Sequence, residues 1–191
     1  MSQVPTIQSI IRDRRSIFPK MFIDKPIDRA IIEELLDLAN FAPTHALTEP
    51  WRFIVLTGAS KTKVGDHLTE WYLANVPEER QSEMKLKKFR TNTEKAGAII
   101  AIVRRRDPDE RIPEWEETAA VAMAVQNMWL SLPAYDLGGY WSSPRSMIGQ
   151  PAFLNLEERE ACLGLFYLGY HQAPELPAKR TPSADKVRWM D

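Results

Sequence analysis

Three short apolar runs constrain the fold of this chain more than any other feature. They are WRFIVLT, AIIAIV and LGLFYLGY, at residues 51–57, 98–103 and 163–170. Each has the length of a strand and is apolar on both faces, so each predicts an interior strand that needs cover on both sides. Helical patterns alternate with these strands along the chain, which predicts one sheet with helices on both faces.

Helical spacing of apolar residues supplies the first covering elements. Isoleucines at positions 7, 10 and 11 predict a short first helix that ends in a basic cluster. Asp28 is placed to cap a second helix, which Pro43 stops. Gly58 ends the first strand, and Ser60 is placed to cap a third helix.

Two further helical segments differ sharply in character. Residues 77–95 are helix-prone and highly charged, and we expect an exposed segment there that covers a site. Residues 114–136 predict the longest helix, with small residues on several faces, as in a helix buried centrally or against a partner subunit. A polar loop is expected at residues 104–109 between these two elements.

Composition excludes several classes of protein. The 25 basic and 26 acidic residues give a net charge of −1, without the basic excess of a general nucleic-acid binder. The single cysteine, Cys162, excludes a disulfide framework and predicts a reducing compartment such as the cytoplasm. Its apolar neighbours predict a buried, inert thiol. No apolar block is long enough to predict a secretory signal or a membrane span.

Motifs of several common active sites are absent. The sequence has no GxGxxG after a strand, no Walker phosphate loop, no GxSxG and no HExxH. The three histidines are too widely spaced to form a local metal-ligand pattern, so we expect no metal site. The run Arg104-Arg105-Arg106 is followed by acidic residues, which favours a solvated loop over a nucleic-acid contact.

Four polar constellations remain, and each has a structural and a functional interpretation. Arg14-Arg15-Ser16 either places cations at a helix C-terminus or forms an anion site from two guanidiniums and a hydroxyl. The loop 43–51 is, taken alone, a rigid connector between a helix and a strand. The stretch 138–144 either makes a turn or lets the backbone approach a flat ligand. Lys179-Arg180 are either solubilising charges in a polar tail or cations of a site.

In chain order these pieces resemble the FMN-dependent nitroreductases, in particular their small single-domain branch. The resemblance rests on Arg14-Arg15-Ser16, on APTHALTEPWRFIVL at residues 42–56, and on Pro113-Glu114-Trp115-Glu116 at the start of the long helix. It continues through GGYWSSP, LGLFYLGY and the basic tail, so it spans nearly the whole chain.

This resemblance implies a single domain over residues 1–191 with an α+β fold. The expected architecture is a three-layer α/β/α sandwich around a mixed, largely antiparallel sheet. The resemblance also implies an obligate homodimer with two FMN sites at the subunit interface. The tail, residues 171–191, is then expected to pack on the partner subunit.

The resemblance also assigns expected roles to site residues. Arg14, Arg15 and Ser16 match the segment that holds the phosphate, the ribityl chain and the pyrimidine edge of FMN. The stretch Pro43-Thr44-His45 matches the segment that reaches the flavin of the partner subunit. Trp141-Ser142-Ser143 match the stretch whose backbone passes the flavin ring near N5, and Lys179-Arg180 match tail cations that approach the phosphate.

Two positions depart from the family pattern. Many members have Asn near position 47 and Gln at position 49, where this chain has Leu47 and Glu49. An amide contact to the flavin at these positions is therefore not expected here.

The chemistry that the resemblance implies needs a bound flavin more than a reactive side chain. Hydride passes from a nicotinamide to flavin N5 only when the rings stack at about 3–3.5 Å, which requires an open flat face. We therefore expect no catalytic side chain, NAD(P)H as the reductant, ping-pong kinetics, and nitroaromatic or quinone-like acceptors. Because the FMN phosphate needs cations, an Arg15→Ala variant is expected to lose FMN.

Two alternatives remain open on the sequence. One is a flavoenzyme of the same fold with another physiological substrate, such as a dehalogenase or an enzyme that oxidises a small metabolite. The other is an FMN-binding or redox-sensing module without turnover. No nucleic-acid or membrane partner is expected in any of these cases.

Overall fold

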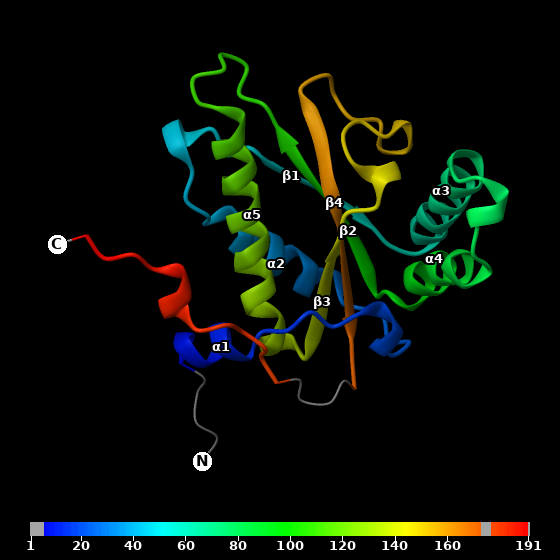
Figure 1. Ribbon diagram of the computed structural model, residues 1–191, viewed down its shortest axis with the longest axis horizontal. Coiled ribbons are helices and arrows are strands. Elements are labelled where there is room, and N and C mark those ends of the chain that lie inside the picture. The colour runs from blue at the N-terminus through cyan, green and yellow to red at the C-terminus, as the bar shows by residue number, and fades with distance from the viewer. Residues whose placement is uncertain (1–5, 173–176, 191) are drawn as a thin grey trace.

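Four antiparallel strands in the order β1-β2-β4-β3 form the sheet of this α+β protein, in a computed structural model that describes residues 6–172 and 177–190 (Figure 1). The strands are β1 (Trp51–Leu56), β2 (Ala98–Arg105), β3 (Leu137–Ser142) and β4 (Glu160–Tyr170). The helices are α1 (Ile7–Asp13), α2 (Arg29–Asn40), α3 (Ala59–Asn75), α4 (Glu83–Lys95) and α5 (Glu114–Ser131).

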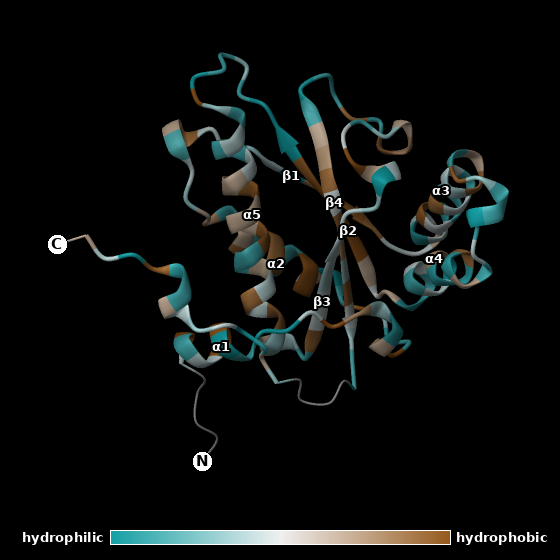
Figure 2. Ribbon diagram, in the orientation of Figure 1, coloured by the Kyte–Doolittle hydropathy of each residue, from teal (hydrophilic) through white to brown (hydrophobic). Residues whose placement is uncertain are grey.

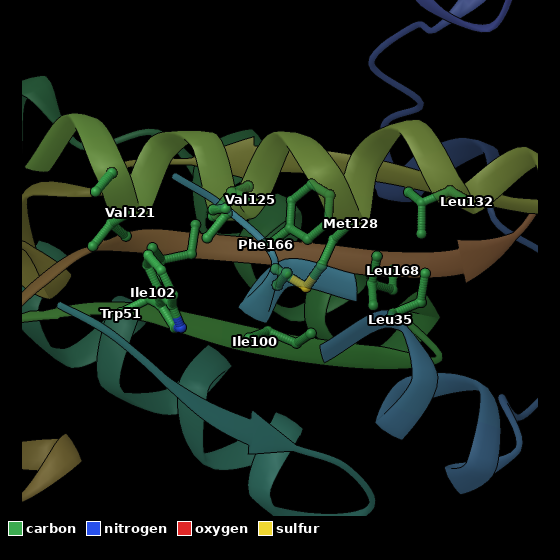
Figure 3. Close-up of a cluster of buried hydrophobic side chains, with 14 of the residues drawn as sticks. Leu35, Trp51, Ile100, Ile102, Val121, Val125, Met128, Leu132, Phe166 and Leu168 are labelled. Atoms are coloured by element: carbon green, nitrogen blue, oxygen red, sulfur yellow. The ribbon is translucent and has the colours of Figure 1, made fainter. Parts of the chain in front are cut away.

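The predicted layers are confirmed. Helices α2 and α5 cover one face of the sheet, and α3 and α4 lie on the other side (Figure 1). Alternate residues of β2 serve the two faces: Ile100 and Ile102 pack with α2 and α5, whereas Ile99 and Ala101 pack toward α3. Figure 3 shows the first of these clusters, in which Phe166 of β4 lies among the side chains of α5.

The predicted interior position of β1 is wrong, because β1 is an edge strand. Trp51 packs in the cluster under α5, and Leu56 packs in the cluster toward α3. The strand is therefore apolar on both faces because helices cover both, although it has a strand neighbour on one side only. Arg52 and Val55 remain exposed.

The sheet is less mixed than expected. Every strand pair in the described chain is antiparallel, and the parallel contribution is an isolated bridge between Ser16 and Gly139. The register of β2 against β4 shifts between Ile102 and Val103, opposite the segment Cys162–Gly164. This shift marks a β-bulge in β4.

Several predicted boundaries move for local reasons. Asp28 caps α2 as expected, because its carboxylate accepts from the N–H of Ala30. Ser60 does not cap α3: the cap is Gly58, and the Ser60 hydroxyl donates to the carbonyl of Thr57. Helix α5 ends at Ser131, and a 3-10 turn over Leu132–Tyr135 completes the segment expected to be helical.

The polar loop expected at residues 104–109 begins two residues later than predicted. Strand β2 continues through Arg105, and Arg104 is buried rather than solvated. Figure 2 shows hydrophilic colour on the loop that follows β2, and hydrophobic colour on the sheet-facing parts of the helices. Within residues 6–172 and 177–190, no helix is both long and apolar enough to cross a membrane.

Candidate functional site

Arg14 occupies an unusual position at the end of α1. One nitrogen of its guanidinium, Nη1, is buried without a hydrogen-bond partner in the described structure. The guanidinium lies over the ring of Trp129, 4.6 Å from its centroid. Burial lowers the pKa of Arg14 from its ordinary value, and the nearby charges of Arg180 and Arg15 lower it further. The site thus gathers cations that repel one another.

Arg15 is held differently from its neighbour. Its Nη1 donates to the carbonyl of Arg12 at 2.6 Å and to the carbonyl of Arg14 at 2.8 Å. These contacts place a cation on the carbonyl end of α1, where the helix dipole favours positive charge. The structural interpretation of the basic cluster therefore describes Arg15, and the anion-site interpretation fits Arg14 better.

Ser16 brings the end of α1 to the edge of the sheet. The N–H of Ile17 donates to the carbonyl of Gly139 at 3.0 Å, next to the bridge between Ser16 and Gly139. Residues along an antiparallel strand direct their backbone groups alternately to the two sides. Since Gly139 faces the outer edge of β3, Trp141 faces the same edge two residues on. Ser143 follows directly after the strand.

The glycines of this strand have another use than the one predicted. A Cβ at Gly138 would meet Ile17 at 2.6 Å, and a Cβ at Gly139 would meet Leu132 at 2.6 Å. The two glycines therefore admit neighbouring side chains of this chain. They do not leave space for a flat ligand at these two positions.

The indole of Trp141 is fixed by the β4 bulge. Its Nε1 donates to the carbonyl of Leu163 at 3.2 Å. Gly164 has a φ of 139°, and a Cβ there would lie 2.5 Å from Trp141 Nε1. The side chain is thus held against the sheet, while the backbone of Trp141 stays on the outer edge.

The loop that contains His45 is built with unusual backbone conformations. Ala46, Leu47 and Glu49 have φ values of 52°, 53° and 40°, in the left-handed region that non-glycine residues seldom adopt. His45 Nδ1 lies 2.7 Å from a carboxylate oxygen of Glu116 on α5. Backbone strain of the kind seen in this loop persists only where surrounding contacts stabilise it, and strained residues are concentrated at functional sites.

Further contacts hold the same loop. The hydroxyl of Thr44 accepts from the N–H of Glu49 at 3.2 Å, and Arg111 donates to the carbonyl of Ala46. Pro43 is exposed just after α2. The loop therefore presents a fixed shape at the first turn of α5.

The structure separates the two predicted halves of the site. The His45 loop lies at the N-terminal end of α5, and Arg14 lies at the C-terminal end, over Trp129 (Figure 1). Helix α5 has 18 residues, so it is about 27 Å long. One subunit therefore does not bring His45 to its own Arg14.

The tail contributes one of its two predicted cations. Arg180 is close enough to Arg14 to lower its pKa. Lys179 is exposed, and its carbonyl accepts from the guanidinium of Arg180. Residues 173–176, which precede this part of the tail, lie outside the described residues.

Trp129 is a further candidate site residue, and its sequence context did not indicate it. Its Nε1 is buried and has no hydrogen-bond partner in the described structure, like Nη1 of Arg14 against its ring. Buried donors are rarely left without acceptors, and each such group is costly. The Arg14 guanidinium near Arg180, with a second buried donor on the ring beneath it, fits an anion that has several acceptor oxygens, such as a phosphate ester. A tryptophan within an apolar helix gives no sequence signal of this kind.

Other chemistry is not supported by the side chains. Among the described residues, no group of three His, Cys, Asp or Glu side chains could hold a metal ion. Cys162 is buried, as predicted, and burial raises the pKa of its thiol to about 11, which disfavours the reactive thiolate.

Comparisons with known proteins agree on one family. The family described as "Nitroreductase family" matches residues 11–170 of the chain. YfhC of Bacillus subtilis, which carries an NAD(P)H nitroreductase name, is 29% identical over 192 residues, covering 98% of this chain and 96% of that protein.

Solved structures show the same fold. A nitroreductase-like family protein from Bacillus cereus superposes with a TM-score of 0.80 at 25% identity, covering 100% of this chain and 99% of the other. NfnB from Sphigopyxis sp. strain HMH, described as an FMN and NADPH-dependent nitroreductase, gives 0.79 at 17% identity. That match covers 98% of this chain and 100% of the other.

Proposed function

The chain belongs to the nitroreductase family, and we propose that it is an FMN-dependent oxidoreductase that uses NAD(P)H to reduce nitroaromatic or quinone-like acceptors. The observation that carries the proposal is Arg14, whose buried Nη1 has no hydrogen-bond partner in the described structure and whose guanidinium lies over Trp129 and near the charges of Arg180 and Arg15. The names of its relatives, which include NAD(P)H and FMN, support the same assignment.

Arg14 would be the principal anchor of the FMN phosphate. Its Nη1 has no hydrogen-bond partner in the described structure, and burial together with the charges of Arg180 and Arg15 lowers its pKa. A phosphate would relieve the repulsion between Arg14 and Arg180. Arg15 and Ser16 complete the segment, and Lys179 would add a more distant cation.

The outer edge of β3 would hold the flavin ring. The backbone of Trp141-Ser142-Ser143 leaves this edge open beyond the bridge at Gly139. Backbone N–H and C=O groups at such an edge match the alternating donors and acceptors of a pyrimidine ring. The fixed indole of Trp141 keeps this stretch in place.

A two-fold dimer would complete each site with the other subunit's loop. Within one chain, Pro43-Thr44-His45 and Arg14 lie at opposite ends of α5. A two-fold axis across the middle of α5 would place the loop of each subunit next to the Arg14 of the other. Ala122 and Met123, at the middle of the helix, are exposed, so this approach is open.

Exposed apolar side chains support the same dimer. Leu47, in the His45 loop, and Trp115, in the first turn of α5, are 82% and 69% exposed, and Phe41 at the end of α2 is 76% exposed. Exposed apolar side chains of this size are typical of interaction surfaces. Trp189 and Met190 of the tail are 84% and 83% exposed, so the tail has apolar side chains available to pack on the partner subunit.

Bound FMN would supply the hydride acceptance and donation that no side chain of this chain provides. The chain's own residues would hold the phosphate, fix the ring edge and leave one face open. Donor and acceptor would use that face in turn, which predicts ping-pong kinetics with no essential side-chain acid.

An absorbance spectrum tests the proposal directly. Purified protein is expected to show flavin bands, and anaerobic NADH or NADPH is expected to bleach them; a nitroaromatic or a quinone should then restore the colour. Bleaching by neither nucleotide would favour an FMN-binding module without turnover. A colourless protein that does not bind added FMN, or a stable monomer in light scattering, would contradict the shared site.

A further inference from the structure

A cavity lies between α4 and the sheet, next to the open edge of β3. Its volume is about 330 Å³, which is enough for one small aromatic molecule. Ser142 and Pro144 line it from the strand proposed to hold the flavin ring, and Tyr140 and Tyr167 line it from the sheet. The cavity therefore adjoins the place where an acceptor must sit.

The walls from the sheet are aromatic. The rings of Tyr140 and Tyr167 are stacked at 29°, with centroids 6.3 Å apart. Phe89 of α4 lines the cavity from the opposite side. A flat ring would meet aromatic surface on both sides, and aromatic groups pack favourably in such arrangements.

The wall from α4 carries positive charge. Lys85, Lys88 and Asn92 line the cavity, and their spacing places them on one helical stripe. Lys85 Nζ also lies over the ring of Tyr72, 4.6 Å from its centroid. Among the described residues that line the cavity there is no carboxylate.

The acidic residues of α4 lie elsewhere. Glu83 and Glu94 line a separate cavity on another face of the helix, together with Lys87 and Arg90. That face is therefore mixed in charge, whereas the face toward β3 is purely cationic. The difference points to an anionic ligand on the β3 side.

We propose that this cavity is the acceptor subsite and that Lys88 and Lys85 select aromatic acceptors that carry a carboxylate or a similar anion. The inference rests on the proposed function, because the acceptor is placed beside Ser142 at the flavin edge. The ring would lie between the aromatic walls, and its anionic group would point toward α4. Neutral acceptors would bind the same walls without the contact to the lysines.

Titration of the oxidised, flavin-loaded protein without reductant tests the subsite. The probes are 4-nitrobenzoate and the neutral 4-nitrobenzyl alcohol, followed by the flavin difference spectrum and by tryptophan fluorescence. Wild type is expected to bind the carboxylate more tightly. Lys88→Gln should raise the Kd for 4-nitrobenzoate about three- to ten-fold, a modest change because the exposed lysine is partly screened by solvent. The Kd for the alcohol should stay within about two-fold of the wild-type value. Lys88→Arg should restore most of the affinity.

Lys87→Gln is the matched control, because Lys87 is the next residue on α4 and faces the other cavity. It should leave the affinity for both probes unchanged. Equal binding of both probes by wild type, or equal losses in K87Q and K88Q, would overturn the proposal. If K88Q lost affinity for NADPH but bound 4-nitrobenzoate as wild type does, Lys88 would serve the nucleotide phosphate. That result would also overturn the proposal.

The same protein separates this inference from the proposed function. Turnover of both acceptors without a charge preference would contradict the subsite alone. A failure of NADH and NADPH to bleach the flavin would contradict the proposed function, whereas the titration would still report on the subsite.

Discussion

The two ends of α5 each carry a cluster of arginines, and the clusters differ in their counter-charges. At the N-terminal end, Arg104 pairs with Glu114, Arg106 with Glu117 at 2.7 Å, and Arg111 with Asp107 at 2.8 Å. At the C-terminal end, Arg14 lies near Arg15 and Arg180, and its Nη1 has no hydrogen-bond partner in the described structure.

This difference separates a structural cluster from the cluster proposed to bind FMN. The first is paired in charge within the chain: Glu117 is completely buried, pairs with Arg106 and accepts from the N–H of Asp107. Nε and Nη1 of Arg104 are also buried without a hydrogen-bond partner in the described structure, but the Arg104 guanidinium lies against the carboxylate of Glu114. The second would gain a counter-charge only from outside the described structure. Arginine content alone is therefore no measure of anion binding, and the number of carboxylates within reach decides it.

The largest expected effect comes from breaking the charge-paired cluster. Glu117→Gln leaves the charge of Arg106 without its buried partner, so we expect a loss of about 3–5 kcal/mol in the free energy of unfolding. Chemical denaturation of the FMN-free protein measures it. Glu157→Gln, which removes an exposed partner of Arg105, is the control and should cost at most about 1 kcal/mol. Equal losses would show that burial does not distinguish the two pairs.

The next largest effect comes from the cluster around Arg14, and it changes the affinity for FMN and not the stability of the fold. Arg14→Gln should raise the Kd for FMN about 10- to 100-fold, as expected for the loss of a charge-assisted hydrogen bond. The free energy of unfolding without FMN should not fall, because the substitution removes a repelled cation. Fluorescence titration with FMN measures the affinity.

Arg12→Gln is the control for Arg14→Gln, since Arg12 is an exposed basic residue of the same helix. Its affinity for FMN should stay close to that of wild type. If Arg15→Gln lost FMN while Arg14→Gln retained it, the anchor would be Arg15 and the comparison between the clusters would fail.

The smallest effect concerns the pH dependence of stability. Bidentate hydrogen bonding from the Arg111 guanidinium lowers the pKa of Asp107 from 3.8 to about 2. A lowered folded-state pKa stabilises the fold above the unfolded value, and this contribution is lost as the pH falls toward the folded value. The difference in unfolding free energy between wild type and Asp107→Asn should therefore shrink between pH 3.8 and about pH 2. A constant difference across this range would show that Asp107 stays protonated or unpaired.

Local patterns predicted most of the elements. Asp28 caps α2, the apolar runs form strands, and the small-residue segment forms the long helix, because these depend on residues close in sequence. The position of β1 at the sheet edge could not be predicted. Strand order depends on which strands pair, and cover on both faces gives the same apolar pattern at an edge as in the interior.

The candidate site divides in the same way. Arg14, Ser16 and the stretch around Trp141 could be selected from the sequence. Trp129 could not, because its orphaned donor is evident only when Arg14 lies on its ring. The proximity of Arg180 to Arg14 likewise depends on the tertiary structure, because these residues are far apart in sequence.

The sequence by itself determined the element types, the inert character of Cys162 and the family to which the chain belongs, because each depends on local order along the chain. The tertiary structure alone decided which arginines are neutralised. Arg106 and Glu117, for example, pair only because the loop after β2 folds back against the first turn of α5. The tertiary structure also placed the two halves of the site at opposite ends of α5, since a helix holds its termini apart by its length.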